Sequence, residues 1–151
     1  PFPTELDDED GRYLRERGAE YGTTTNRPRR CGWLDLVVLK YAIRVNGITE
    51  ICLTKLDVMD GMKTIKVCTK YKVGEDEYDE FPLNLDVFSK AVPQYEELPG
   101  WEGDLSKISK YENLPENAKK YIEYITRVTG VKIKLISVGS KRSQTIQLLK
   151  L

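Results

Sequence analysis

Residues 34–57 read LDLVVLKYAIRVNGITEICLTKLD, and this stretch decides the fold class. Apolar residues recur at helical spacing over its first half, and Asn46-Gly47 then supplies a helix stop. The apolar run Ile48–Leu53 follows and favours a buried strand, which ends in the polar residues of 54–57. A helix followed by such a strand is typical of an α/β sheet, in which ligands bind at the carboxyl ends of the strands. The apolar helical positions are Leu34, Val37, Val38, Tyr41, Ala42 and Val45.

A second helix–strand pair lies near the end of the chain. Pro115 marks a helix start and Gly130 its end. Val131–Ser137 then predicts a buried strand that ends in a small polar loop, and residues 144–149 predict a last strand. The two pairs together predict an α/β protein with a mostly parallel sheet and flanking helices. The apolar face of the second helix consists of Ala118, Tyr121, Ile122, Ile125 and Val128.

The remaining segments carry weaker patterns. Residues 1–30 are polar and predict an irregular segment with one or two helical turns around 12–17. Residues 63–73 alternate between apolar and polar side chains, which predicts a half-exposed strand at a sheet edge. The acidic residues 75–80 predict a solvated turn between strands, and the proline-containing stretch 81–113 predicts a long excursion with short elements. On the alternating strand, Ile65, Val67, Thr69 and Tyr71 would face one side and Lys66, Cys68, Lys70 and Lys72 the other.

Composition excludes several classes of protein. The 151 residues include 24 Lys+Arg and 24 Asp+Glu, so no overall basic field favours a nucleic-acid partner. No apolar run approaches the about 20 residues that cross a bilayer, and no signal-peptide pattern opens the chain, so we expect no membrane association. The absence of histidine excludes a Ser-His-Asp or Cys-His mechanism carried within this chain, and any His-ligated metal site.

The cysteines and the first residues indicate the setting of the chain. Cys31, Cys52 and Cys68 lack CxxC spacing, and we expect them to be reduced, buried small hydrophobic residues of a cytoplasmic protein. The chain opens Pro1-Phe2-Pro3 without an initiator methionine, so we expect a segment of something longer. Trp33, Trp101 and Tyr41 are interpreted as packing residues.

Two strand ends carry residues suited to reading a purine. Thr54-Lys55-Leu56-Asp57 follows the first buried strand, and an aspartate there can accept hydrogen bonds from guanine N1–H and its exocyclic amine. A lysine stem can lie over the purine face. Ser137-Val138-Gly139 follows the second strand, and a tight Ser-x-Gly loop offers backbone N–H groups to a purine carbonyl oxygen. Ordinary solvated loop charges remain the alternative for residues 54–57.

The densest polar feature is Gly22–Trp33, which reads GTTTNRPRRCGW. Consecutive threonine hydroxyls and loop amides, followed by Arg27, Arg29 and Arg30, suit a small ligand that bears carboxylates or phosphates, because arginine donates in planar, bidentate pairs. A nuclear-localisation-like cluster and a nucleic-acid patch are the alternatives. The neutral total charge and the absence of interleaved aromatic residues count against both.

Several motifs, in register over essentially the whole chain, resemble adenylosuccinate synthetase. The resemblance implies the C-terminal third of a P-loop NTPase-like α/β fold. The motifs are Pro1–Leu6, Gly22–Asp35, Leu53–Val58, Leu98–Trp101, Leu114-Pro115 with Ala118 and Tyr121-Ile122, and Ile136–Gly139.

The resemblance implies a cytoplasmic, homodimeric ligase of AMP biosynthesis. The family joins IMP and L-aspartate, with GTP and Mg²⁺, to give adenylosuccinate, GDP and phosphate. GTP first phosphorylates O6 of IMP, and the aspartate amine then displaces that phosphate. The resemblance also implies that residues 1–33 hold the aspartate and IMP loop and that residues 34–151 form the guanine-binding part.

The resemblance assigns roles to individual residues. It implies that Thr24 and Thr25 contact aspartate, that Arg27 bridges aspartate and IMP, and that Arg29 meets the aspartate carboxylate near GTP. One departure is Asn26, where the family usually has glycine; asparagine tolerates a left-handed backbone better than other non-glycine residues. The full implied aspartate and IMP set is Thr23, Thr24, Thr25, Asn26, Arg27, Pro28 and Arg29, and the implied GTP set is Arg29, Lys55, Leu56, Asp57, Ser137, Val138 and Gly139.

The chain lacks the family's other catalytic parts. It has no phosphate-binding Gly-x-x-Gly-x-Gly-Lys loop with its aspartate and no catalytic histidine. Neither catalytic residues nor metal ligands are therefore expected in this segment, and the Mg²⁺ ligands would lie upstream. We predict that the 151 residues alone are inactive. A non-catalytic guanine-nucleotide-binding module remains the alternative function, and an interaction protein with a basic loop a more distant one.

Overall fold

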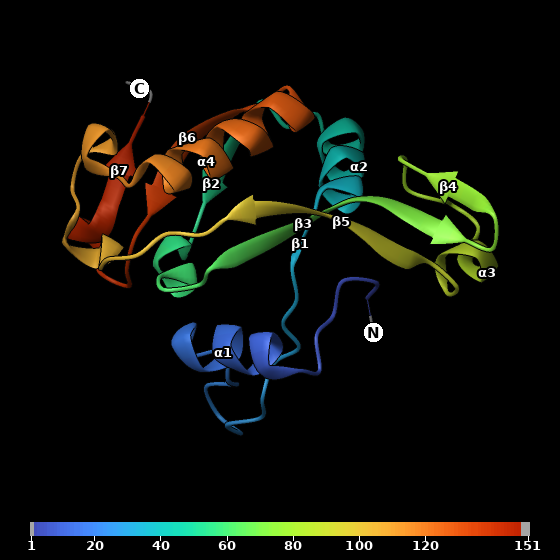
Figure 1. Cartoon of the computed structure of the whole chain (residues 1–151), viewed down its shortest axis with the longest axis horizontal. Helices are drawn as coiled ribbons and strands as arrows, with labels where there is room; N and C mark the ends of the chain where they lie inside the picture. Colours follow the sequence, from blue (N-terminus) through green and yellow to red (C-terminus); the bar gives the residue numbers. More distant parts are fainter. Residues whose placement is uncertain (1, 149–151) are drawn as a thin grey trace. The chain divides into compact units, whose positions relative to one another are not determined.

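A computed structural model describes residues 2–148 of the chain (Figure 1). Pro1, at the start of the first motif, and Leu149, at the end of the predicted last strand, lie outside the described residues. The chain forms two compact units. The first comprises Pro1–Ala42 and Lys66–Glu97, and the second comprises Ile43–Ile65 and Leu98–Leu151.

The first unit opens with helix α1, Glu9–Arg17, which extends the one or two turns predicted. The Asp8 carboxylate caps the start of this helix by accepting a hydrogen bond from Gly11 N at 2.9 Å. The cap stabilises the helix because the first amides of a helix have no acceptor within the helix itself. The other elements that contribute to this unit are β1 (Leu34–Asp35), α2 (Leu36–Asn46), β3 (Thr64–Val73), β4 (Asp76–Tyr78), α3 (Leu85–Phe88) and β5 (Val92–Pro99).

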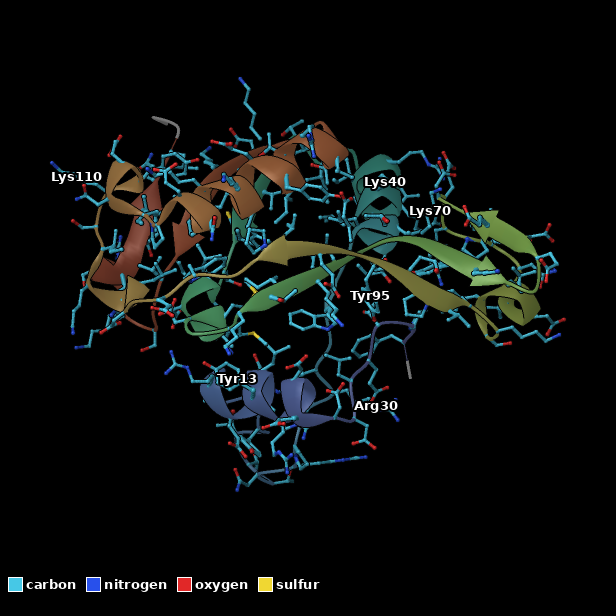
Figure 2. All side chains as sticks on the ribbon, viewed as in Figure 1. Tyr13, Arg30, Lys40, Lys70, Tyr95 and Lys110 are labelled. Carbon is cyan, nitrogen blue, oxygen red and sulfur yellow. The ribbon has the colours of Figure 1, made fainter. Side chains whose placement is uncertain are left out.

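Strand β3 is central in its sheet, so the edge position predicted for it is wrong. It pairs with β1 in parallel, with β4 in antiparallel, and also with β5. The two faces of β3 also differ less in burial than the alternation suggests, because Cys68, on the side predicted to be exposed, is fully buried. Lysines on that side pair with acidic residues, as in Lys66–Glu97 at 3.5 Å and Lys70–Glu77 at 3.0 Å (Figure 2 labels Lys70).

The acidic stretch contributes a strand rather than only a turn. Gly74 has φ +64°, a left-handed conformation that glycine adopts without steric cost, so the chain reverses there and β4 returns to pair with the end of β3. The excursion 81–113 also contains more regular structure than predicted, since β5 is eight residues long.

The second unit contains a mixed three-stranded sheet. Strand β2 (Glu50–Leu53) pairs in parallel with β6 (Lys132–Ser137), and β6 pairs in antiparallel with β7 (Thr145–Gln147) (Figure 1). With one parallel and one antiparallel pair here, and both kinds in the first unit, the sheets are mixed, so the α/β class is confirmed but the mostly parallel arrangement is not. The single-turn elements are η1 (Leu56–Met59), η2 (Leu105–Lys107), η3 (Tyr111–Asn113) and η4 (Arg142–Gln144).

Helix α4, Glu116–Thr129, confirms the second predicted helix. Pro115 precedes it, and Gly130 ends it with φ +70°. Its buried face contributes much of the core of this unit, together with Ile133 and Ile136 of β6. The buried residues of the helix are Ala118, Tyr121, Ile122, Tyr124 and Ile125.

The packing roles of the aromatic residues are as predicted. Trp33 and Trp101 are buried, and the ring of Tyr41 stacks on Phe81 with 4.8 Å between centroids. The cysteines are free, as predicted, but only Cys68 is buried; Cys31 is half-buried and Cys52 is exposed. The prediction of three buried cysteines is therefore wrong for Cys31 and Cys52. For Cys52 the reason is that the sequence pattern does not show which side of the short strand β2 faces outward.

A half-buried carboxylate, Asp35, connects the start of α2 to β3. One carboxylate oxygen accepts hydrogen bonds from Val37 N and Val38 N, at 3.0 and 3.1 Å, and thereby caps the start of α2. The other accepts from the Tyr71 hydroxyl at 2.5 Å. Burial, and secondarily the Asp35 charge, raise the pKa of the Cys68 thiol from 9.0 to about 12. Burial and the Asp35 hydrogen bond raise the pKa of Tyr71 as well.

The stability of the chain is expected to fall in alkaline solution. Because the fold raises the Cys68 pKa, the native state binds that proton more tightly than the unfolded chain. This contribution is complete below pH 9 and is lost as the pH rises from 9 towards 12, by at most about 1.4 kcal/mol per pH unit for this group. Urea unfolding at half-unit intervals from pH 8 to 11 measures the effect. In Cys68→Ala the decline should begin only near pH 10, the ordinary pKa of Tyr71, which the fold also raises. Equal declines between pH 9 and 10 in both proteins would contradict the expectation.

Candidate functional site

The threonine and arginine loop is closed at its base by backbone hydrogen bonds. Tyr21 and Pro28 form an antiparallel bridge, and Arg29 N donates to Glu20 O at 2.9 Å. Within the loop, Gly22 N donates to Arg27 O and Asn26 N donates to Gly22 O, each at 2.8 Å. Residues 23–30 are all exposed. The loop thus has a defined shape and presents its hydroxyl and guanidinium groups outward.

Asn26 has φ +51° and adopts the left-handed conformation. A side chain with a Cβ normally avoids this conformation, and asparagine is among the few that visit it readily. Asparagine at this position is therefore compatible with the turn that a glycine would make.

The arginines of the loop differ in their surroundings. Arg29 Nη1 pairs with Glu20 Oε2 at 2.9 Å, and its carbonyl accepts a hydrogen bond from Arg15 Nε at 2.9 Å. Arg30 Nε pairs with Glu5 at 3.2 Å (Figure 2 labels Arg30). Arg27 is exposed on the same loop. A negatively charged small molecule would meet several guanidinium donors here.

The two predicted purine-reading loops lie side by side. Strands β2 and β6 are parallel neighbours, with Leu53 opposite Ile136, so both loops leave the same edge of the sheet. The backbone N–H of Lys55 donates to the Ser137 hydroxyl at 2.9 Å. Lys55 itself has φ +58° and ψ +37°, which makes a sharp turn between the strand and η1. Residues 54–57 and residues 137–139 therefore lie together at one edge of this sheet.

Individual residues of these loops offer different groups. Leu56 and Val138 have fully buried side chains, and the Val138 N–H already donates to Gln144 O at 2.9 Å, so both residues fix the loops in the core. Lys55 is exposed, and Asp57 is half-buried. Oδ1 of Asp57 is a buried oxygen that accepts no hydrogen bond within residues 2–148, although the residue takes part in other interactions.

The sequence did not predict Asp60 and Gln144, whose side chains form hydrogen bonds that support these loops. The Asp60 carboxylate accepts from Trp101 Nε1 at 2.8 Å and from Leu105 N at 3.0 Å. The Gln144 side chain donates to Ser106 O at 3.1 Å and accepts from Lys141 N at 3.0 Å. No periodic pattern marks Gln144, and its only signal is its position soon after the Ser-x-Gly loop.

Other kinds of site are not evident in residues 2–148. No group of three or more His, Cys, Asp or Glu side chains there could hold a metal ion. No helix in that range is long and apolar enough to cross a membrane. Two open hollows of about 330 and 410 Å³ lie beside α4, but neither is lined by a residue of the predicted site. The two loop systems lie in different units: residues 22–30 in the first, and the purine-reading loops in the second.

Comparison with known proteins places the chain. A family model described as adenylosuccinate synthetase matches residues 1–146. An adenylosuccinate synthetase of Geotalea uraniireducens is 53% identical over 148 residues, which are 98% of this chain and 34% of the relative. One of Pelotomaculum thermopropionicum is 54% identical over 146 residues, which are 97% of this chain and 34% of the relative.

A solved structure agrees with the sequence comparisons. The fully ligated adenylosuccinate synthetase of Plasmodium falciparum superposes with a TM-score of 0.93 at 42% identity, over 99% of this chain and 36% of that one. The chain spans about a third of the length of the curated relatives it matches. The chain belongs to the adenylosuccinate synthetase family.

Proposed function

We propose that the chain is the C-terminal segment of an adenylosuccinate synthetase, the GTP-dependent ligase that joins IMP and L-aspartate to give adenylosuccinate, GDP and phosphate. The observation that carries the proposal is the close match, in sequence and fold, to a ligated enzyme of this family over 99% of the chain. The whole protein would have a P-loop NTPase-like fold, act in the cytoplasm and form a homodimer.

In this proposal residues 1–33 carry the aspartate and IMP loop. Thr24 and Thr25 offer hydroxyls and backbone amides to aspartate, and Arg27 lies between aspartate and IMP. Arg29 would bind the aspartate carboxylate near GTP. The exposure of residues 23–30 supports this, because ligand atoms can reach them without unfolding the loop. Guanidinium groups in this position lower the cost of gathering anionic substrates in one partly dry site.

Residues 34–151 would carry guanine recognition. Asp57 would accept hydrogen bonds from N1–H and the 2-amino group, and the Lys55 stem would lie over the purine. The loop Ser137–Gly139 would lie against O6 and donate to it from a backbone N–H other than that of Val138, which already donates to Gln144 O. The 2.9 Å bond from Lys55 N to Ser137 Oγ supports this, because it holds the two loops close enough to share one base.

Magnesium is not expected to be held by this chain alone, because the chain lacks the phosphate-binding loop that the family uses. The family's reaction uses Mg²⁺, but residues 2–148 contain no group of three candidate ligands. We therefore assign its ligands, the phosphate-binding loop and the catalytic residues to parts of the enzyme outside this chain. The role of residues 1–151 is to bind and orient aspartate and the guanine base.

A chimaera tests the proposal. Residues 1–151 replace the aligned third of the Geotalea uraniireducens relative, and the product is assayed with IMP, GTP, Mg²⁺ and aspartate. Adenylosuccinate formation that requires both GTP and aspartate is expected, while residues 1–151 alone should give none above blank. A folded chimaera without turnover, or turnover by the chain alone, would overturn the proposal.

The alternative is a guanine-nucleotide-binding module without ligase function. The two purine-reading loops favour it as the second candidate, since they would serve either function. The same chimaera separates the two, because a bare module would bind GDP without forming any aspartate-dependent product.

A further inference from the structure

Gln144 lies against the second purine-reading loop. Its Oε1 accepts from Lys141 N at 3.0 Å, and its backbone carbonyl accepts from Val138 N at 2.9 Å. Gly139 faces the side-chain amide so closely that a Cβ at residue 139 would collide with Oε1, Cδ and Nε2 of Gln144. The loop 137–141 is thus folded around one half-buried amide.

The same amide connects this loop to η2. Nε2 of Gln144 donates to the Ser106 carbonyl at 3.1 Å. On its other side η2 is held by Asp60, which accepts from Leu105 N at 3.0 Å and directly follows η1. Asp60 is buried, and the Trp101 indole also donates to it, so η2 is bonded to a carboxylate that is itself fixed in the core. Hydrogen bonds through η2 therefore connect the loop of Asp57 to the loop of Gly139.

The loops are also joined directly by the bond from Lys55 N to Ser137 Oγ. The connections form a closed ring: the Lys-x-Asp loop to Asp60, Asp60 to η2, η2 to Gln144, Gln144 to the Ser-x-Gly loop, and Ser137 back to Lys55. The pairing of β2 with β6 already fixes where the two loops leave the sheet. The ring adds a second connection beyond the strand ends, which limits how the loop tips can turn relative to each other. Such a ring suits recognition of a rigid planar base, because small errors in the distance or angle between donor and acceptor weaken hydrogen bonds.

We propose that Gln144 is a positioning residue for guanine recognition, which sets the Ser137–Gly139 loop against O6 of the base without touching the nucleotide. This rests on the proposed function. The simpler possibility is that Gln144 only stabilises the fold. The two differ in their consequences, because a positioning role affects the nucleotide alone and a general structural role affects every substrate.

The test uses Gln144→Leu in the chimaera. Leucine has nearly the volume of glutamine but makes neither side-chain hydrogen bond. We expect the KM for GTP to rise about tenfold, because both side-chain hydrogen bonds that set the loop are lost and part of this loss reaches the base. The kcat and the KM values for IMP and aspartate should stay within twofold. ITP, which keeps O6 but lacks the 2-amino group, should be affected by the same factor as GTP.

Gln94→Leu is the matched control. Within residues 2–148 the Gln94 side-chain amide donates to the neighbouring carbonyls of Val92 and Pro93, away from the purine-reading loops, so its loss should change no kinetic constant. If Gln144→Leu folds poorly, as judged by thermal unfolding, Gln144→Met replaces it. An unchanged KM for GTP in a folded variant overturns the inference, and so does an equal loss for all three substrates.

The proposed function fails in a different way. If the chimaera containing the unaltered chain gives no GTP-dependent product, the ligase assignment falls, whatever Gln144 does. Calorimetric titration with GDP then still tests Gln144, since the expected result is weaker GDP binding by the Leu variant than by the unaltered protein. Equal affinities would overturn the positioning role.

Discussion

Replacing Asp57 by Asn is expected to change the preferred nucleotide of the chimaera from GTP to XTP. A carboxylate accepts from both guanine N1–H and the 2-amino group, whereas an amide accepts one hydrogen bond and donates the other. The amide therefore repels the 2-amino group but matches xanthine, which carries a carbonyl at that position. Hydrogen bonds to charged groups contribute about 1.5–3 kcal/mol each, so kcat/KM for GTP should fall roughly 10²- to 10³-fold.

Steady-state rates with GTP, ITP and XTP measure the change. The unaltered chimaera should rank GTP above ITP and XTP, and Asp57→Asn should rank XTP first. Asp86→Asn, which removes the same charge from an exposed helix start, should leave the ranking unchanged. A variant of Asp57 that still prefers GTP would show that this side chain does not read the base.

That each purine-reading loop follows a short strand could be predicted from the sequence, but not that the two strands are neighbours. Each loop follows a short apolar run preceded by a helix, and parallel neighbouring strands end at one edge of a sheet. The register of Leu53 with Ile136 and the hydrogen bond from Lys55 to Ser137 show from the structure that the two loops are adjacent. The mixed character of the sheets was not predictable in the same way, because β7 is only three residues long and pairs through a tight loop.

The position of β3 in its sheet could not be predicted from the periodicity of its sequence. Alternation reports which side chains are polar, but it does not report how many strands lie alongside. Lys66 and Lys70 indicated a solvent-facing edge, yet they form ion pairs with Glu97 and Glu77 of neighbouring strands. The β5 partner follows β3 only after a hairpin and a one-turn helix, so no local pattern announces it.

Gln144 was missed for a related reason. Its importance comes from contacts with Lys141, Ser106 and Gly139, and the contact with Ser106 spans 38 residues of sequence. A single glutamine near a strand start has many ordinary interpretations, and only the three-dimensional arrangement distinguishes them. The loop Gly22–Trp33 was easier, because its hydroxyls, turn residues and arginines are contiguous.

Replacing Arg29 by Ala is expected to impair the use of aspartate far more than that of GTP. Arg29 is exposed, and its ion pair with Glu20 holds the guanidinium on the loop where the proposal places the aspartate carboxylate. Loss of a charged hydrogen-bond pair to a carboxylate costs about 1.5–3 kcal/mol, so the KM for aspartate should rise roughly 10- to 100-fold. The KM for GTP should rise far less, because the guanine base would be bound by the two purine-reading loops. Initial rates at varied aspartate and fixed GTP, then the reverse, measure both.

Arg29→Lys separates charge from geometry in the same assay. Lysine keeps the positive charge but not the planar pair of donors, so the KM for aspartate should fall between those of the unaltered chimaera and Arg29→Ala. Arg12→Ala removes an exposed arginine of α1 outside the loop and should change neither KM. Equal losses for aspartate and GTP in Arg29→Ala would remove the distinction between a ligase segment and a guanine-binding module. An unchanged KM for aspartate would place the aspartate carboxylate away from Arg29, because a guanidinium that binds a carboxylate cannot be removed without loss of affinity.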